Sequence, residues 1–104
     1  MSSTKPATHQ EAAFLVIERI IERLFRESGR PVSHDVIAEA YGKDEVGRQI
    51  LVDRQQRLSK GHTLEWLAAN DVAWFAAKMS AGTLASSGRY IRSRVNGKWA
   101  YALA

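Results

Sequence analysis

Hydrophobic residues recur at helical intervals through most of the chain and alternate with polar residues only near its end. Residues 9–28 show the clearest helical pattern, because apolar side chains fall three and four positions apart opposite a charged face. The apolar positions are Ala13, Phe14, Ile17, Ile20, Ile21, Leu24 and Phe25. Thr8 and Glu11 have the spacing of a capping box, and Gly29 followed by Pro31 favours termination. The pattern predicts a first helix over residues 9–28.

A second and a third helix are expected after Pro31. Ser33 is the expected N-cap of the second helix, and Gly42 is expected to end it. The expected buried residues of this helix are Val36, Ile37, Ala40 and Tyr41. The third helix is expected over residues 45–60, before Gly61, with apolar positions Val46, Ile50, Leu51 and Leu58. Gly47 weakens its start, because glycine costs about 1 kcal/mol relative to alanine inside a helix.

A fourth helix is predicted over residues 64–81, with Thr63 as its N-cap. Its expected apolar positions are Leu64, Leu67, Ala68, Val72, Phe75, Ala76 and Met79, and Trp66 and Trp74 are also assigned to the core. Asn70 and Asp71 favour caps over helix interiors, so two shorter helices that meet at Asp71 are the alternative. We expect one continuous helix.

The chain from residue 88 to residue 103 carries the strongest local signal, a β-hairpin. Two β-prone runs flank Asn96 and Gly97, and a type I′ turn needs positive φ at both central residues. Counting outward from this turn pairs Val95 with Lys98, and the last pair is Tyr90 with Leu103. An isolated hairpin is marginally stable in water, so we expect it to dock on the helices or to pair with another chain.

Side-chain alternation divides this hairpin into two faces. One face is small and mainly apolar, and we expect it to pack on the helices; it holds Ile91, Ser93, Val95, Ala100 and Ala102, with Lys98 near the tip. The other face interleaves arginines with aromatic residues; it holds Tyr90, Arg92, Arg94, Trp99, Tyr101 and Leu103. Such a face is typical of surfaces that hold phosphates and stack bases. The alternative is a cation–π pair that only covers the indole of Trp99.

Charge is distributed unevenly along the 104 residues. Residues 1–71 hold ten lysines and arginines against eleven acids, whereas residues 72–104 hold five basic residues and no acid. The net charge of +4 therefore comes from the last third of the chain. A segregated positive charge favours a polyanionic partner, nucleic acid first.

Other chemistry is excluded or not expected. The chain has no cysteine, which excludes disulfides and thiolate chemistry within it. His9, His34 and His62 stand at predicted helix starts, where we expect them to face solvent, and they lack the spacing of metal ligands, so we expect no metal and no other cofactor. No nucleophile elbow or phosphate-binding glycine loop occurs, and we do not expect an enzyme. The polar residues 1–8 are expected to be a disordered tail, and the longest uncharged apolar run, residues 72–77, is too short to span a bilayer. We expect a cytoplasmic protein.

The segment from Ser33 to Gly61, with a helix before it and a hairpin after it, resembles a winged-helix DNA-binding domain. The residues that carry the resemblance are Val36-Ile37-Ala38-Glu39-Ala40-Tyr41-Gly42, which are similar to the first helix and turn glycine of a helix-turn-helix. The resemblance implies that the third helix reads DNA, with Arg48, Gln49, Gln55 and Gln56 near base edges and Arg54, Arg57 and Lys60 near phosphates. The chain departs from the family by polar residues at Lys43 and Arg48 and by the additional helix over 64–81.

The sequence therefore predicts one α+β domain over residues 9–104, with four helices and a terminal hairpin. The predicted function is non-enzymatic binding of nucleic acid, most simply double-stranded DNA, by a regulator or an accessory factor. The predicted contact residues are Arg89, Tyr90, Arg92, Arg94, Lys98, Trp99 and Tyr101 on the hairpin and Arg48, Gln55, Arg57 and Lys60 on the third helix. The alternative is a protein–protein interaction module that binds an acidic protein, or a homodimer, through the same hairpin face.

Overall fold

A computed structural model describes residues 9–58, 61–84 and 87–104. The fold is α+β and mainly helical, as predicted. The elements in chain order are α1 (His9–Ser28), β1 (Val32–Ser33), α2 (His34–Lys43), α3 (Glu45–Arg57), α4 (Leu64–Ala81), a 3₁₀ turn η1 (Ser87–Arg89), β2 (Tyr90–Val95) and β3 (Lys98–Leu103). The tail expected over residues 1–8 and the predicted contact residue Lys60 lie outside the described residues.

The ends of α1 and α4 are those that the sequence predicts. Helix α4 is continuous, its N-cap Thr63 accepts a hydrogen bond from the Trp66 N–H at 3.0 Å, and Gly82 closes it with a φ of 70°. The other two helices differ from the prediction by a few residues. Helix α2 continues through Gly42 to Lys43, and α3 ends at Arg57 rather than at residue 60. Helix ends are the least determined part of a periodic pattern, because the last turn has few side-chain constraints.

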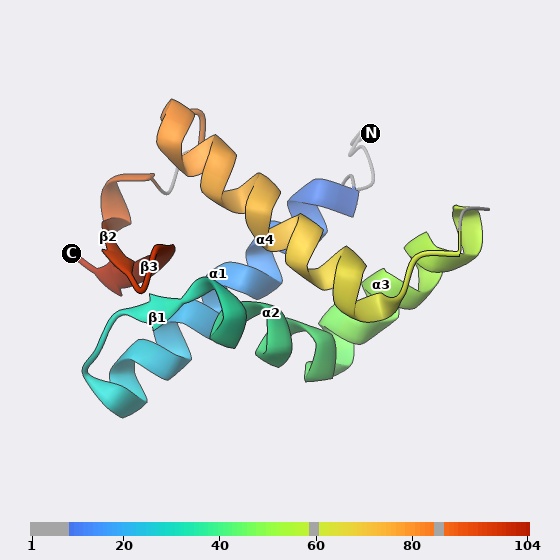
Figure 1. Ribbon diagram of the computed structural model, residues 1–104, viewed down its shortest axis with the longest axis horizontal. Coiled ribbons are helices and arrows are strands. Elements are labelled where there is room, and N and C mark those ends of the chain that lie inside the picture. Colours follow the sequence, from blue (N-terminus) through green and yellow to red (C-terminus); the bar gives the residue numbers. More distant parts are fainter. Residues whose placement is uncertain (1–8, 59–60, 85–86) are drawn as a thin grey trace, which may run out of the picture.

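The core lies where α4 meets the other three helices and the sheet. Figure 1 shows α4 crossing the molecule obliquely, from the end that holds α3 to the end that holds the hairpin. Its buried face faces α1, α2 and α3, so the additional helix of this chain is central to the fold. The fully buried side chains include Ile17, Ile20, Ile21, Ile37, Tyr41, Leu51, Leu67, Val72, Phe75 and Tyr101.

Five side chains that the helical pattern assigns to apolar faces lie instead at the surface, and one of them, Leu58, is 36% exposed just after the end of α3. Val36 and Val46 are 51% and 54% exposed, and Trp66 and Trp74 are 48% and 38% exposed. Each of these four stands at the edge of an apolar stripe, where a helix turned by one position exchanges buried for exposed residues. The indole of Trp66 stacks on the ring of His62 at 3.9 Å, so the prediction of a core role is wrong for both tryptophans.

The hairpin is completed by a short strand that the sequence pattern does not predict. Strand β1 pairs antiparallel with β3, through Val32 opposite Tyr101 and Ser33 opposite Ala100, and gives the order β1-β3-β2. Two residues are too few to show an alternating pattern, and Ser33 also serves as the N-cap position of α2. The hairpin is thereby anchored to the chain between α1 and α2.

Candidate nucleic-acid interface

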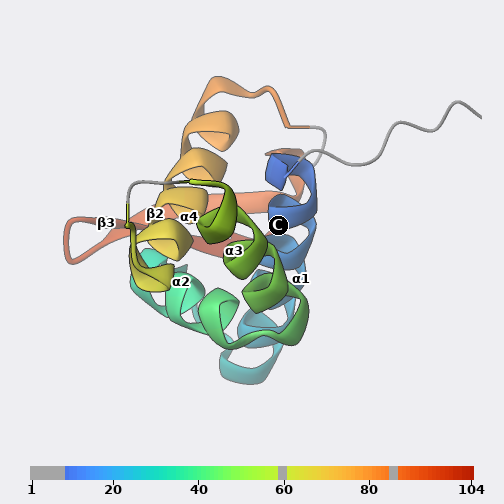
Figure 2. The same ribbon diagram turned by 90° about the vertical axis from the view of Figure 1, so that its right-hand side faces the viewer.

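The turn of the hairpin has the backbone conformation that the sequence predicts. Asn96 and Gly97 have φ values of 53° and 80°, as a two-residue type I′ turn requires. All predicted pairs of the register are present, beginning with Val95 opposite Lys98. Figure 2 shows this turn extending past the helices, so the tip of the hairpin is open to a partner.

The larger side chains of the two hairpin faces are exchanged relative to the prediction, whereas Ala100 is buried as expected. Tyr90 and Tyr101, expected on the partner-binding face, pack edge-to-face on Phe75 of α4 with ring centroids 6.2 and 5.5 Å away. Ile91 and Val95, expected in the core, are 57% and 41% exposed. The aromatic face removes more apolar surface from water, because phenol rings are larger than these aliphatic chains. The two tyrosines are therefore not available to stack on bases.

The part of this face that lies nearest the turn keeps its arginines exposed. The guanidinium carbons of Arg92 and Arg94 lie 4.9 and 4.7 Å from the centre of the half-buried Trp99 indole. Arg92 donates to the hydroxyl of Ser80 on α4 at 2.6 Å, and Arg94 donates to the carbonyl of Gly97 at 3.1 Å. Within the described residues neither guanidinium forms an ion pair with a carboxylate. Both charges are held in place and are available to an anion.

The other two predicted cations of the hairpin have acidic partners. Arg89 forms ion pairs with Glu22 at 2.5 Å and with Glu18 at 3.7 Å, both on α1. The ammonium of Lys98 lies 2.6 Å from a carboxylate oxygen of Asp35, and this hydrogen bond lowers the pKa of Asp35. Exposed ion pairs contribute about 0–1 kcal/mol, so a phosphate can replace the carboxylate at either cation. We rank both residues below Arg92 and Arg94.

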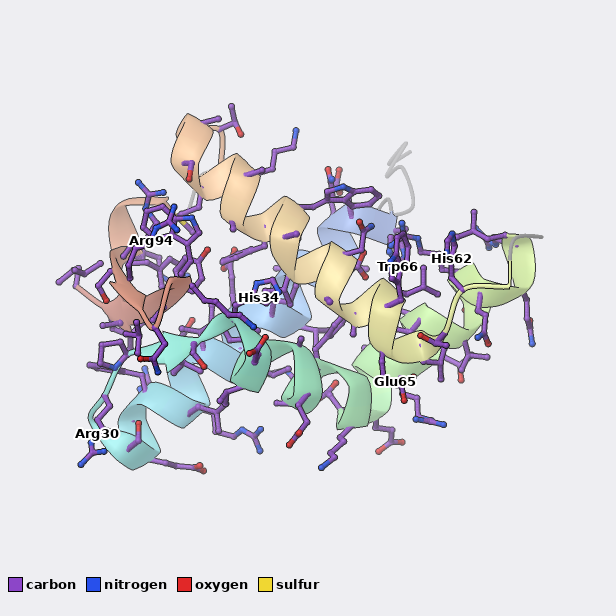
Figure 3. The ribbon with its side chains drawn as sticks, viewed as in Figure 1. Arg30, His34, His62, Glu65, Trp66 and Arg94 are labelled. Carbon is purple, nitrogen blue, oxygen red and sulfur yellow. The ribbon has the colours of Figure 1, made fainter. Side chains whose placement is uncertain are left out.

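A groove runs between the hairpin and α4. It has a volume of about 650 Å³, and it is lined by Ala69, Ala73 and Ala77 of α4, by Trp99, Arg94 and Lys98 of the hairpin and by His34 at the start of α2. Figure 3 shows Arg94 and His34 on the hairpin side and the α2 side of this region. Partial burial lowers the pKa of His34, which favours its neutral imidazole. Because the α4 side chains are small, the charged groups of the groove are Arg94 and the ion pair of Lys98 with Asp35.

The predicted contact residues of α3 lie far from the hairpin. Arg48 and Arg57 are exposed, but the side-chain amide of Gln55 donates to the backbone carbonyl of His62 at 2.8 Å. Figure 1 places α3 and the hairpin at opposite ends of the molecule, whose longest extent is 38 Å. The structure therefore does not bring the two predicted groups of contact residues into one site.

A buried polar cluster, absent from the predictions, joins all four helices. The carboxylate of Asp71 is fully buried and forms an ion pair with Arg54. It also accepts a hydrogen bond from the hydroxyl of Tyr41 at 2.7 Å, and the imidazole of His9 lies 3.2 Å away. The guanidinium carbon of Arg54 lies 4.6 Å from the centre of the Trp74 ring. A buried carboxylate with this many partners is satisfied, so we assign the cluster a structural role.

This cluster corrects two sequence expectations. Arg54 was expected near phosphates, but it is held by Asp71 and only 14% of its side chain is exposed. His9 was expected to face solvent, but it contacts Asp71 and Arg54. The single sequence signal is an aspartate in the interior of an apolar helix, where a charge is retained only with a partner. That signal identifies Asp71 but not the residues that meet it.

The described part of the chain contains no group of three or more histidines and acids that could hold a metal ion. Among the same residues, no helix is long and apolar enough to cross a bilayer. Comparisons with models of known protein families, with curated proteins and with solved structures gave no match.

Proposed function

We propose that this protein is a small non-enzymatic nucleic-acid-binding protein, a regulator or an accessory factor, which contacts double-stranded DNA through the exposed end of its hairpin. Arg92 and Arg94 bind phosphates, and Lys98 adds a third cation once phosphate replaces Asp35. One observation carries the proposal: two guanidiniums without a carboxylate partner in the described residues are fixed against the Trp99 indole. Fixed cations lose little side-chain entropy when they bind an anion.

The distribution of charge supports the same function. The five basic residues after residue 71 lie on α4, in η1 or on the hairpin. All eleven acidic residues of the chain lie before residue 72. Release of counterions from DNA supplies most of the affinity of such a surface, and it does so without reading sequence. The proposed contact therefore gives affinity, and base recognition needs a further element.

Helix α3 is the proposed second contact, through Arg48 and Arg57. The two ends of the molecule lie up to 38 Å apart, and one turn of B-DNA spans about 34–36 Å. A duplex that lies along the long axis of the protein brings phosphates to the cations of the hairpin at one end and of α3 at the other. The likeness to a winged-helix domain belongs to this proposal, because α2 and α3 are joined through Asp44 alone and a hairpin follows later in the chain.

A salt titration tests the proposal. Fluorescence anisotropy of a labelled mixed-sequence duplex gives the affinity at several salt concentrations for the parent, for Arg92→Gln/Arg94→Gln and for Arg48→Gln/Arg57→Gln. Each phosphate contact that is removed lowers the slope of log affinity against log salt by about one unit. We expect the hairpin variant to lower the slope by about two units.

The charge-matched control is Arg23→Gln/Arg26→Gln, which removes the same charge from exposed positions of α1. A hairpin variant that binds the duplex as tightly as this control at every salt concentration overturns the proposal. An unchanged slope for the α3 variant alone restricts the contact to the hairpin.

A further inference from the structure

The sheet leaves one edge of a six-residue strand without a neighbour in the described part of the chain. The order β1-β3-β2 places β2 at the edge, paired with β3 alone. The backbone groups of such an edge are a template for another strand. The register shows which N–H and C=O groups of β2 point outward, because residue pairs in an antiparallel ladder alternate between hydrogen-bonded and non-hydrogen-bonded pairs.

The two-residue turn fixes which amides of β2 face outward. The pair next to such a turn exchanges both backbone hydrogen bonds, so Val95, Ser93 and Ile91 face β3. The same alternation reaches the base of the hairpin, where the Ala104 N–H donates to the Arg89 carbonyl at 2.8 Å. The N–H and C=O groups of Arg92 and Arg94 consequently point away from the sheet.

Along β2, apolar side chains on one face of the sheet alternate with arginines on the other face. Ile91 and Val95 expose apolar surface on one face, and Arg92 and Arg94 present cations on the other. A second copy of the chain that pairs antiparallel through β2 brings these arginines opposite each other, and like charges directly opposite destabilise a sheet. Charge complementarity therefore favours an acidic strand over a second copy.

We propose that the free edge of β2 accepts an extended acidic segment of a partner protein as a fourth, antiparallel strand. Its acidic residues lie opposite Arg92 and Arg94, and its intervening apolar residues cover Ile91 and Val95. The backbone supplies the hydrogen bonds, and the alternation of side chains supplies the specificity. The inference does not depend on nucleic-acid binding, but the two ligands share Arg92 and Arg94, so the acidic segment displaces DNA.

Peptide binding to the full chain tests the proposal. The probe is a fluorescent peptide that alternates glutamate with valine or threonine, and its control has the same composition with the glutamates contiguous. In antiparallel pairing the glutamate N–H groups face β2, so methylation of these amide nitrogens weakens binding by about tenfold or more. Methylation of the intervening amide nitrogens leaves binding within about threefold, since these groups face away.

A charge exchange keeps the test independent of folding defects. We expect Arg92→Glu/Arg94→Glu to stop binding the acidic peptide and to bind a peptide with lysine in place of glutamate. Arg48→Glu/Arg57→Glu on α3 still binds the acidic peptide in preference to the lysine peptide. Amide exchange followed by NMR adds a direct readout, because the peptide protects the amides of Arg92 and Arg94. Equal binding of the contiguous-acid peptide, or equal effects of the two methylation patterns, overturns the proposal. A parent protein that binds the acidic peptide but not the duplex contradicts only the proposed function.

Discussion

Gly47 shows how one close contact reverses a rule of helix propensity. A Cβ at this position, built on the present backbone, lies 2.4 Å from the carbonyl oxygen of Tyr41 and 2.7 Å from its ring. Asp44 also accepts a hydrogen bond from the Gly47 N–H at 2.9 Å, so the backbone here is held on both sides. The glycine that weakens α3 by propensity is required by the packing of α2 on α3.

Gly47→Ala is therefore expected to destabilise the protein by about 1–3 kcal/mol, the usual effect of overpacking. Gly42→Ala is the matched control, because no atom lies within 4 Å of a Cβ at this helical position. The control is expected to gain up to about 1 kcal/mol. Urea denaturation of both variants measures the difference, and a stabilised Gly47→Ala contradicts the packing argument.

The ion pair of Asp71 and Arg54 gives a second prediction at the scale of residues. Arg54→Met leaves the buried carboxylate without its cation, and we expect a loss of about 3–5 kcal/mol in the free energy of unfolding. Arg54→Met/Asp71→Asn removes both charges, and the oxygen of the introduced side-chain amide still accepts a hydrogen bond from the Tyr41 hydroxyl. The double variant is expected to be more stable than Arg54→Met alone. Strictly additive losses in a denaturant double-mutant cycle contradict a direct pair.

The sequence reveals little of the cluster around Asp71. Asp71 is conspicuous as a charge between Leu67 and Phe75, but its local meaning is a helix break. Its partners come from positions that lie 17, 30 and 62 residues away. No local pattern contains such distances, so the cluster could not be predicted.

At the scale of elements, the hairpin separates what a pattern determines from what packing determines. Alternation and the Asn96-Gly97 turn specify the strands, the register and the membership of each face. Which face is buried depends on the space between the hairpin and the helices. The rings of Tyr90 and Tyr101 fill this space by packing on Phe75 of α4. The prediction of the buried face was wrong for this reason, while the two strands of the hairpin were predicted correctly.

Substitution on each face tests the observed orientation. Tyr101→Ala is expected to destabilise the protein by about 3–5 kcal/mol, as is usual for a buried aromatic residue. Ile91→Ala, on the exposed face, is expected to change stability by less than about 0.5 kcal/mol. Tyr101→Phe serves as the control for ring packing: the buried Tyr101 hydroxyl has no hydrogen-bond partner in the described structure, so its removal leaves stability unchanged or higher. Equal effects of the two alanine variants in thermal unfolding contradict the orientation.

At the scale of the whole molecule, burial of all three tyrosines couples stability to alkaline pH. Burial raises the pKa of Tyr101 from 10.0 to about 12. Burial also raises the pKa of Tyr90, and burial with the charge of Asp71 raises that of Tyr41. The unfolded chain loses these protons near pH 10 while the folded chain keeps them, so this contribution is complete below pH 10 and decreases above it.

Absorbance at 295 nm, which follows tyrosinate, measures this effect. The native protein is expected to show no phenolate step near pH 10, and the phenolate is expected to form only near pH 12 or on unfolding. The chain in concentrated guanidinium chloride serves as the reference and titrates near pH 10. A native tyrosine that titrates near pH 10 contradicts the burial of that residue.

The arrangement of the elements in space was outside the reach of the sequence. Four helices and the hairpin were predicted within a few residues, because each has its own period, cap or turn. The placement of α3 and the hairpin at opposite ends was not predicted, since nothing along the chain specifies the direction in which α4 runs relative to the other elements. The predicted contact residues consequently belong to two ends of the molecule.

The order of strands determines when the fold can be completed during synthesis. Strand β3 is the middle strand, yet it is the last element of the sheet to leave the ribosome. Until it emerges, β1 lacks its only partner in the described sheet, and Phe75 lacks the Tyr101 ring that covers it. The three-stranded sheet, and the covering of Phe75 by Tyr101, can therefore form only after the chain has been synthesised through residue 103.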